Sequence, residues 1–417
     1  MIQVAIVLGA ALVCGMITKA KSWILAIIGI IMFALLLKWQ ALIILSLAVL
    51  VAATSKLQKN QFTAIILASL LIIPFGFMRI GDSFTLHVGY SVFAFSAIAQ
   101  IIETYKSRLS PSFSESLAYL LYFPKMMAGP IIKPEPFIRQ LRNCNATTLT
   151  RYKGIKLLII GAFIKYLIIG SGMDENIELG LNQILGIFRF GLAFYLDFFS
   201  YCLMAMGLSE LIGIHLPLNF NAPYRAKSFK DFWKRWNITL SEWLKDYVYI
   251  PLGGNRKGKI RQYLNILIVF TVSAIWHGLS LPFMLWGWIH AILVVLEKSI
   301  IKFVQGGRLR AYLYGIIVSC IAIILWQCFI SPDITSLFNR FEVIGTPAAI
   351  DWTVLINTLF LLIVVFTIDI PVVSKRIYNI AQSKSGIIVE GSCLAIMLAL
   401  TLLCPNQLTF NFFYLRF

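Results

Sequence analysis

Charged residues are scarce in this 417-residue chain, and acidic residues are the scarcest. Only 13% of the residues are charged, with 18 Asp and Glu against 36 Lys and Arg, while 59% are hydrophobic. A soluble domain carries roughly 25% charged residues. Apolar runs of about 15 to 20 residues recur from one end of the sequence to the other. These features exclude a soluble globular domain and predict an all-α, polytopic membrane protein.

The sequence also lacks the spacings that hold metals and disulfides. Its seven cysteines have no CxxC pairing and lie mostly inside apolar runs, which is typical of small core residues. No GxSxG, HExxH or P-loop motif occurs. Among the four histidines, His277 and His290 are separated by Gly278 and Pro282, so they do not share a helix at metal-ligand spacing. We expect no metal and no tightly bound cofactor.

The net charge of +18 favours anionic partners. Cytoplasmic loops that follow the positive-inside rule and face anionic membrane lipid explain most of it. A basic entry site for an anionic donor, such as the phosphates of coenzyme A, is the alternative. Nucleic-acid binding is excluded because no soluble basic domain exists. The opening segment, Met1–Thr18, has no basic n-region and no cleavage site, so we expect a retained first helix.

Recurring apolar runs predict roughly ten to thirteen membrane segments. We interpret them as one domain, with N-terminal helices over 1–80, a core over 87–300 and closing helices over 301–417. No linker or internal repeat divides the chain. The expected helices are Ile2–Thr18, Trp23–Leu37, Ala41–Thr54, Phe62–Phe77, His87–Glu103, Gly154–Gly170, Phe188–Ile214, Tyr263–His277, Pro282–Glu297, Tyr312–Phe329, Thr353–Ile370 and Ile387–Leu403.

Three further segments break this pattern. Ala118–Arg139 contains four prolines and a glycine, which predicts either a re-entrant, cavity-lining element or an interfacial loop, and favours the first. His215–Tyr224 is polar and bounded by prolines, so we expect a surface loop. Phe229–Ile250 places aromatic residues at spacings of three and four with basic residues between them, which predicts an amphipathic helix on the cytoplasmic membrane surface.

Acids inside apolar helices are expensive and usually face the interior of a bundle. Asp197 and Glu210 both lie within the expected helix Phe188–Ile214. They are candidates for a substrate pathway, and Asp197 could equally be a structural partner of Lys165 or Arg189.

His277 is the candidate for chemistry. It ends an apolar helix, between Trp276 and Gly278. An imidazole accepts a proton near neutral pH and is the usual general base for activating a hydroxyl. Periodicity alone leaves the alternative of a histidine anchored at the membrane interface.

Several motifs in order carry a resemblance to a known family. The segments FPK…AGPI (123–131), LPLNFNAPY (216–224), FWKRW (232–236), LSEWL (240–244), DYVYIPLGGNR (246–256), WHG (276–278) and FFYLRF (412–417) carry it. Together they resemble the membrane-bound O-acyltransferases. The match is densest with the bacterial branch that includes the alginate O-acetyltransferase membrane subunit and peptidoglycan O-acetyltransferases.

The resemblance implies that His277 is the catalytic histidine and that Asn237 occupies the second signature position. The bacterial branch usually has histidine there, so a scheme with two histidines is in doubt. Asn237 cannot act as a base, but it can hold a carbonyl or the donor by hydrogen bonds. A second departure is Leu203, where the family commonly has an acid; Asp197 and Glu210 lie nearby in sequence, and an inactive relative is an open alternative.

The resemblance also implies the family's fold, a helix bundle around a central tunnel, and its O-acyltransferase activity. The donor is acetyl-CoA or a similar acyl thioester, the chain lies in the inner membrane, and an extracytoplasmic acetyltransferase or carrier protein passes the acetyl group to a cell-surface polysaccharide. Candidate donor-binding residues are Lys234, Arg235, Trp236, Arg256 and Lys257. Candidate tunnel or pathway residues are Asp197, Glu210, Trp276 and Pro130.

Two other classes stay open. A lipid or protein O-acyltransferase would share the core and use a longer acyl donor. A transporter should show an inverted repeat with paired broken helices, which the sequence does not display. A scaffold without catalysis would tolerate replacement of His277.

Overall fold

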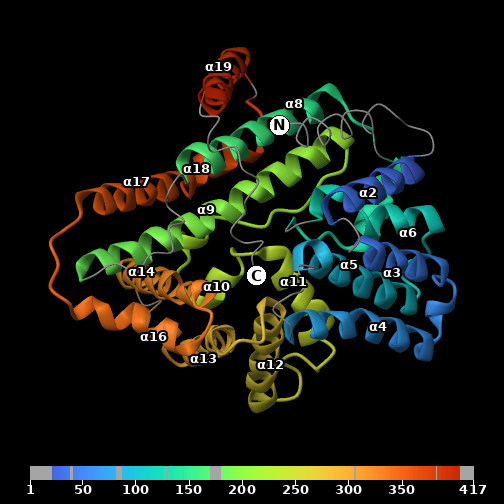
Figure 1. Ribbon diagram of the computed structural model, residues 1–417, viewed down its shortest axis with the longest axis horizontal. Helices are drawn as coiled ribbons and strands as arrows, with labels where there is room; N and C mark the ends of the chain where they lie inside the picture. Colours follow the sequence, from blue (N-terminus) through green and yellow to red (C-terminus); the bar gives the residue numbers. More distant parts are fainter. Residues whose placement is uncertain are drawn as a thin grey trace. The chain divides into compact units, whose positions relative to one another are not determined.

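The computed structural model describes residues 21–37, 41–80, 87–126, 129–143, 145–169, 180–304, 307–381 and 383–403. Within these ranges every regular element is a helix and no strand occurs (Figure 1). The predicted all-α class is therefore confirmed. The expected helix Ile2–Thr18, the aromatic C-terminal motif, and Cys14, Cys144 and Cys404 lie outside the described residues.

The chain divides into two compact units. Unit 1 comprises the residues up to Gly161 together with Tyr201–Pro217, and unit 2 comprises Ala162–Ser200 and the residues from Leu218 onwards. The long helix α9 (Leu181–Ile212) contributes its first part to unit 2 and its last part to unit 1. The prediction of one domain stays a prediction.

Unit 1 consists of short and medium helices that pack at small residues. Gly29 of α2 lies against the backbone of Leu121, because a Cβ at Gly29 would come within 2.2 Å of the Leu121 carbonyl oxygen. Gly154 of α8 and Gly207 of α9 face each other in the same way, each Cβ position lying 2.7 Å from the other residue's carbonyl oxygen. Small residues of this kind let helix backbones approach closely in membrane proteins. The elements are α2 (Lys21–Leu37), α3 (Ala41–Ala53), η2 (Leu57–Lys59), α4 (Gln61–Ile80), α5 (His87–Tyr105), α6 (Phe113–Leu120), η3 (Phe123–Lys125), α7 (Pro134–Asn143) and α8 (Thr148–Phe163), whose last two residues belong to unit 2.

Unit 2 contains the helices that carry the motifs FWKRW, LSEWL, DYVYIPLGGNR and WHG. The π-helical turn η4 (Ile164–Ile168) precedes α9. The remaining elements are η6 (Pro223–Arg225), α10 (Phe229–Trp233), α11 (Ile238–Leu244), the π-helical turn η7 (Lys245–Tyr249), α12 (Lys259–His277), α13 (Leu281–Val304), α14 (Arg308–Leu325), α15 (Gln327–Ile330), α16 (Ile334–Glu342), η8 (Val343–Gly345), α17 (Trp352–Ile368), α18 (Pro371–Tyr378) and α19 (Lys384–Leu403).

Four helical segments of the described chain are long and apolar enough to cross a membrane: Leu181–Ile212, Leu281–Lys298, Arg308–Ile330 and Ser385–Leu403. A fifth span arises if α17 and α18, bent by 73° at Asp369 and Ile370, count as one. Shorter apolar helices occur at Lys21–Leu35, Ala41–Ala53 and Gln61–Ile72. The chain is thus a polytopic membrane protein, and the tunnel and the count of ten to thirteen stay predictions.

Two expectations are wrong. Phe229–Ile250 is not one surface helix: it is broken into α10, α11 and η7, and Phe229, Phe232 and Trp236 are buried. The expected surface loop His215–Tyr224 is exposed at His215 and Asn221 but buried at Asn219, Phe220 and Tyr224, which are each at most 5% exposed. In both segments the buried aromatic residues pack against other residues of unit 2.

The proline-rich segment Ala118–Arg139 is broken, as predicted. It contains the end of α6, the short helix η3 and the start of α7. Pro124, Pro130 and Pro134 are buried. The buried, non-helical backbone at Pro130 agrees with the favoured interpretation of an element enclosed by protein.

Candidate active site

His277 is the last residue of α12 and is buried among aromatic rings. Its side chain is only 6% exposed. The ring centroids of Trp276, Trp286 and Phe329 lie 4.3, 5.2 and 4.7 Å from the imidazole centroid. Low-polarity surroundings of this kind exclude water and strengthen any electrostatic interaction with a bound substrate.

Gly278 allows this arrangement. A Cβ on Gly278 would lie 2.5 Å from the ring of Phe283, which stacks on the imidazole at 6.0 Å. The Gly278 amide donates to the Ala274 carbonyl oxygen at 2.9 Å and so ends the helix directly after the histidine. The Trp-His-Gly motif therefore has a packing reason for its glycine.

Asn237 stands at a sharp break between α10 and α11. Its backbone is left-handed, with φ 41° and ψ 55°, a conformation that asparagine adopts more easily than most residues. The side chain is 6% exposed and does not cap α11. The side-chain amide of Asn237 forms no hydrogen bond to any part of the chain that the structure describes, so this amide remains available to a ligand.

The loop after Pro217 clamps this break from both sides. The Asn219 carbonyl oxygen accepts from the Ile238 amide at 3.0 Å, and Asn219 Oδ1 accepts from Thr239 Oγ1 at 2.6 Å. On the other side, the Asn221 amide donates to the Arg235 carbonyl oxygen at 3.0 Å. The NFN motif thus holds Asn237 in its unusual backbone conformation, a role that its sequence did not reveal.

Glu297 fixes the start of α10. Its carboxylate accepts from the Phe229 amide at 2.6 Å, the Lys230 amide at 3.1 Å and the Tyr314 hydroxyl at 3.0 Å. A buried carboxylate at a helix N-terminus satisfies amides that lack intrahelical partners. The sequence analysis named Glu297 only as the end of a predicted helix and gave it no role. The feature that could have indicated it is a single acidic residue at the end of an apolar helix.

Aromatic stacking places the Asn237 break and His277 in the same cluster. Trp236 stacks on Trp326 with ring centroids 4.5 Å apart. Trp326 lies 5.3 Å from Phe329, which in turn lies 4.7 Å from His277. His277 and Trp236, the neighbour of Asn237, therefore belong to one buried aromatic cluster, formed by α12, α13, α15, Trp326 between α14 and α15, and the segment before α11.

The candidate donor-binding residues fall into two groups. Lys234, Arg256 and Lys257 are exposed. Arg235, in contrast, is half-buried, with its Nε 2.9 Å from Asp231 Oδ1 and its Nη1 donating to the Asn221 carbonyl oxygen at 3.2 Å. Arg235 therefore supports the clamp, and Trp236, which is 3% exposed, belongs to the aromatic cluster.

The two intramembrane acids both have cationic partners. Asp197 is fully buried and forms an ion pair with Lys165, which confirms the structural alternative drawn from the sequence. Glu210 pairs with Lys153 Nζ at 2.6 Å and with His215 Nδ1 at 2.8 Å.

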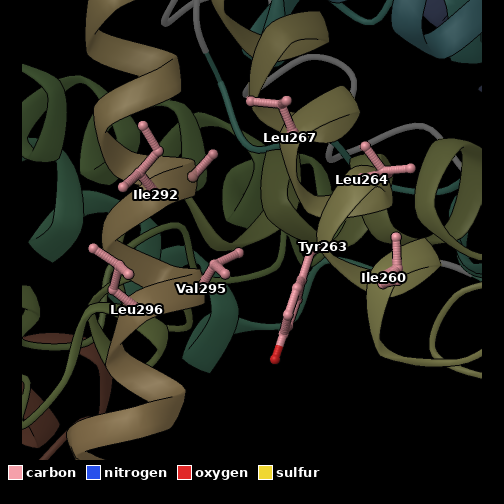
Figure 2. Close-up of a pocket in the computed structure, with 8 residues that line it drawn as sticks. Ile260, Tyr263, Leu264, Leu267, Ile292, Val295 and Leu296 are labelled. Carbon is pink, nitrogen blue, oxygen red and sulfur yellow. The ribbon is translucent and has the colours of Figure 1, made fainter.

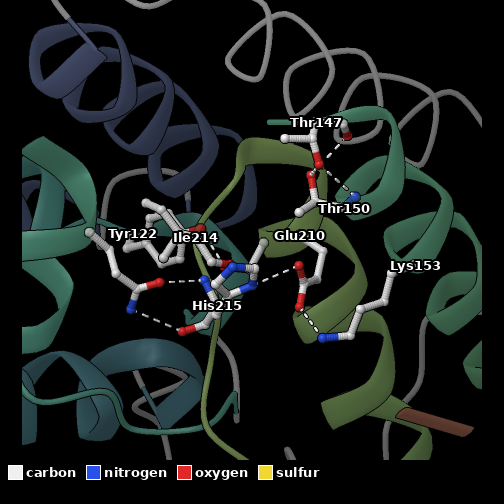
Figure 3. A network of polar contacts seen from close by, with 9 residues as sticks. Tyr122, Thr147, Thr150, Lys153, Glu210, Ile214 and His215 are labelled. Atoms are coloured by element: carbon white, nitrogen blue, oxygen red, sulfur yellow. Dashed lines mark hydrogen bonds and ion pairs between the residues drawn. The ribbon is translucent and has the colours of Figure 1, made fainter. Parts of the chain in front are cut away.

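Figure 3 shows the Glu210 network in unit 1. Gln140 fixes the backbone of His215, because its Oε1 accepts from the His215 amide at 2.8 Å and its Nε2 donates to the His215 carbonyl oxygen at 3.2 Å. The hydrogen bond to Glu210 raises the pKa of the His215 imidazole above its ordinary value. Next to it, the Tyr122 and Ser209 hydroxyls lie 2.6 Å apart.

Asp369 is a buried acid that sequence reasoning did not single out. It lies at the bend between α17 and α18 and is 1% exposed. Its carboxylate accepts from the Tyr195 hydroxyl at 3.0 Å and from the Tyr224 amide at 3.2 Å. The signal was present, since Asp369 interrupts an apolar run two residues before Pro371. These contacts tie the loop after Pro217 to α9 and α17.

Comparison with known proteins places the site in a family. The family model described as the membrane-bound O-acyltransferase family matches residues 24–337. The chain belongs to the membrane-bound O-acyltransferase family. The matched range contains His277, Asn237 and every residue of the aromatic cluster.

Bacterial relatives are similar over about half of the chain. A peptidoglycan O-acetyltransferase of Helicobacter pylori is 34% identical over 257 residues, which are 52% of this chain and 49% of the relative. A probable alginate O-acetylase AlgI of Pseudomonas syringae is 29% identical over 264 residues, 60% of this chain and 50% of the relative. A teichoic acid D-alanyltransferase of Bacillus subtilis is 30% identical over 228 residues, 50% of this chain and 58% of the relative. The chain thus spans about half the length of the curated relatives it matches.

Among the described residues, no group of three or more His, Cys, Asp or Glu side chains is placed to hold a metal ion. The candidate site consists of the imidazole of His277, the aromatic rings that surround it, and the side-chain amide of Asn237. Such a set can hold a thioester and exchange a proton with a hydroxyl.

Proposed function

We propose that this membrane-bound O-acyltransferase moves an acetyl group from a cytoplasmic thioester donor, acetyl-CoA or a similar compound, toward O-acetylation of a cell-surface polysaccharide. The observation that supports this most directly is the buried imidazole of His277, which shares one aromatic cluster with the Asn237 break. The relatives named for alginate and peptidoglycan O-acetylation favour acetyl as the group and a polysaccharide as the final acceptor.

In the proposed reaction, His277 takes the proton from an acceptor hydroxyl. The oxygen attacks the thioester carbonyl carbon, a C–O bond forms, and the C–S bond breaks as the tetrahedral intermediate collapses. The proton held by the imidazolium passes to the departing thiolate, which restores neutral His277. A positioned base of this kind contributes about 10²- to 10⁴-fold to the rate.

Asn237 acts on the donor carbonyl. Its side-chain N–H groups donate to the oxygen that becomes negative during the attack, which a neutral amide does without exchanging a proton. The loss of one such donor typically costs about 10²- to 10³-fold in kcat. Asn237 therefore replaces a second histidine with a group that only stabilises charge.

The remaining candidate site residues have supporting roles. Lys234, Arg256 and Lys257 are exposed cations that attract the donor's phosphates. Trp276 is half-buried beside His277 and contacts the acyl group on its path. Asp197 and Glu210 hold helices through their lysine partners, and Pro130 shapes the buried break in unit 1, so we do not assign these three to the path.

The partners follow from this reaction. The chain lies in the inner membrane, surrounded by lipid, with the donor on the cytoplasmic side. An extracytoplasmic acetyltransferase or carrier protein supplies the acceptor hydroxyl and passes the acetyl group to the polysaccharide. No nucleic acid takes part.

The test is the acetate released by mild alkali from cell-surface polysaccharide, in cells whose only copy of the gene is wild type, His277→Ala or His290→Phe, at equal membrane levels. His290 is the matched control, because it is also fully buried among aromatic rings and makes no hydrogen bond to the described residues. We expect acetate to fall to background in His277→Ala and to persist in His290→Phe.

The same measurement separates the alternatives. D-alanine in place of acetate in the alkaline release would assign the chain to the activity named for the Bacillus subtilis relative. Loss of an acylated lipid or protein in His277→Ala, with polysaccharide acetate intact, would indicate a lipid or protein O-acyltransferase. Unchanged acylation of every kind in His277→Ala would contradict catalysis and leave a transporter or a scaffold.

A further inference from the structure

The helices α12 and α13 pack tightly at one end and separate toward the other. A Cβ at Gly287 of α13 would lie 2.7 Å from the Phe270 carbonyl oxygen and 3.0 Å from the Cβ of Ala274. This contact brings the two backbones together near His277. Toward the start of α12 no such glycine occurs, and a groove opens between the helices.

The groove is apolar and has a volume of about 270 Å³. Figure 2 shows Ile260, Tyr263 and Leu264 of α12 on one side and Ile292, Val295 and Leu296 of α13 on the other. Several of these side chains are strongly exposed, including Ile260 at 78%, Leu296 at 58% and Ile292 at 53%. The helix α13 is long and apolar enough to cross a membrane, and an exposed apolar surface on such a helix faces acyl chains.

A cation that has no hydrogen-bond partner among the described residues lies beside Tyr263, one of the residues that line the groove. The Lys298 ammonium lies 4.8 Å above the centre of the Tyr263 ring, and its Nζ is buried with no hydrogen-bond partner in the described part of the chain. Lys230 adds a second positive charge that acts on it. A buried ammonium is costly unless an anion compensates it.

The position of this cation along the helix matters. Lys298 lies in the last two turns of α13, which ends at Val304. The facing start of α12 carries Lys259 and Arg261, directly after Arg256 and Lys257. Basic residues at the end of a span mark the cytoplasmic interface, where anionic lipid phosphates lie. The apolar groove and the unpartnered cation are thus arranged like the chain and the headgroup of one lipid.

We propose that this groove binds an anionic phospholipid, with one acyl chain between α12 and α13 and the phosphate at Lys298. The charge at one end favours a lipid over a second copy of the chain, which would bring the same cations together. The proposal goes beyond acyl transfer and does not rest on it. It predicts a resident lipid beside the helix pair that carries His277.

The experiment is native mass spectrometry of the purified full chain in detergent, titrated with phosphatidylglycerol or phosphatidylcholine of identical acyl chains. We expect one phosphatidylglycerol to be retained at an affinity about fivefold above that of phosphatidylcholine, from the attraction of one lysine. Lys298→Gln should abolish the preference and Lys298→Arg should keep it. Leu264→Trp, which fills the groove from an exposed position, should weaken both lipids.

Matched controls come from other helices. Lys375→Gln removes an exposed charge on α18, and Leu313→Trp enlarges an exposed side chain on α14; both should bind as the wild type does. Each variant is first shown to be monodisperse. Equal affinity for the two lipids in the wild type, an unchanged preference in Lys298→Gln, or a dimer that Leu264→Trp dissociates would each overturn the proposal.

Discussion

His277 and His215 are two histidines in opposite surroundings. The His277 side chain is 6% exposed and its neighbours are the rings of Trp276, Phe283, Trp286 and Phe329. The His215 side chain is 58% exposed and bonds to a buried carboxylate. One imidazole is buried against aromatic rings, and the other is largely exposed and paired with a carboxylate.

The difference shows which imidazole can serve as a base. A carboxylate partner stabilises the protonated form of His215 and commits it to an ion pair that joins Glu210 to the loop after α9. The rings around His277 bury its imidazole in surroundings of low polarity, where an electrostatic interaction with a bound substrate is strengthened. Burial thus separates His277 from His215, and the Trp-His-Gly motif separates it from His290, which is also buried among rings.

The largest expected effect is the loss of the His277 base. His277→Gln keeps a polar side chain of similar length but cannot take up a proton, so acyl transfer should fall at least about 100-fold. The paired variant His215→Gln should retain transfer within about twofold, because it loses one ion pair whose imidazole is largely exposed. Acetate release from polysaccharide at matched membrane levels measures both. Equal loss in the two variants would remove the distinction between these histidines.

The next effect tests the amide of Asn237. Asn237→Gly keeps the left-handed backbone and removes the side chain, so acyl transfer should fall by about 10²-fold while the fold persists. Asn237→His restores a donor at the same place and should recover part of the rate. Transfer rates in membranes and thermal unfolding in detergent separate the two contributions. A Gly variant with full activity would show that the amide does not touch the donor.

A smaller effect is expected at the support of α10. Glu297→Gln leaves one acceptor oxygen where the carboxylate has two that receive the Phe229 and Lys230 amides. An unsatisfied buried amide costs about 1–3 kcal/mol, so the melting temperature should fall by several degrees. Glu135→Gln, an exposed acid on α7, is the control and should melt as the wild type does. A Glu297→Gln variant of unchanged stability would mean that water replaces the lost contact.

The smallest effect is the pH dependence of the His215–Glu210 pair. Because the folded protein raises the pKa of His215 above 6.5, the pair stabilises the fold fully below that pH. The contribution is lost as pH rises through the folded pKa, and it stays below about 1 kcal/mol because the imidazole is more than half exposed. Wild type should therefore lose its small thermal advantage over His215→Gln between about pH 6 and pH 9. An advantage that grows with pH would reverse the assigned sign.

Most of the long helices could be predicted from the sequence, because apolar runs of that length have few alternatives. The expected helix Tyr263–His277 lies within α12, and Ile387–Leu403 lies within α19. Breaks were harder to predict. Phe229–Ile250 has the periodicity of one helix, yet Asn219 and Asn221 hold a left-handed residue in its middle. Hydrogen bonds from a loop about twenty residues away override a local pattern.

The site was predicted in part for the same reason. The motifs indicate His277 and Asn237 and the tryptophan that precedes each, but not the rings of Trp286, Trp326 and Phe329. Glu297, Asp369 and Trp326 stand far from these two in sequence, and they enter the arrangement only through packing. Lys165 was weighed as a partner of Asp197, and the ion pair confirms it.

By itself the sequence determined the class of this protein: its composition requires helices in a membrane, and its ordered motifs indicate the family and the two signature residues. Only the tertiary structure decided what surrounds those residues. The aromatic cluster, the clamp on Asn237 and the carboxylate at the start of α10 each join segments distant in the chain. Such contacts depend on how helices pack, and a local pattern of apolar and polar residues carries no record of that packing.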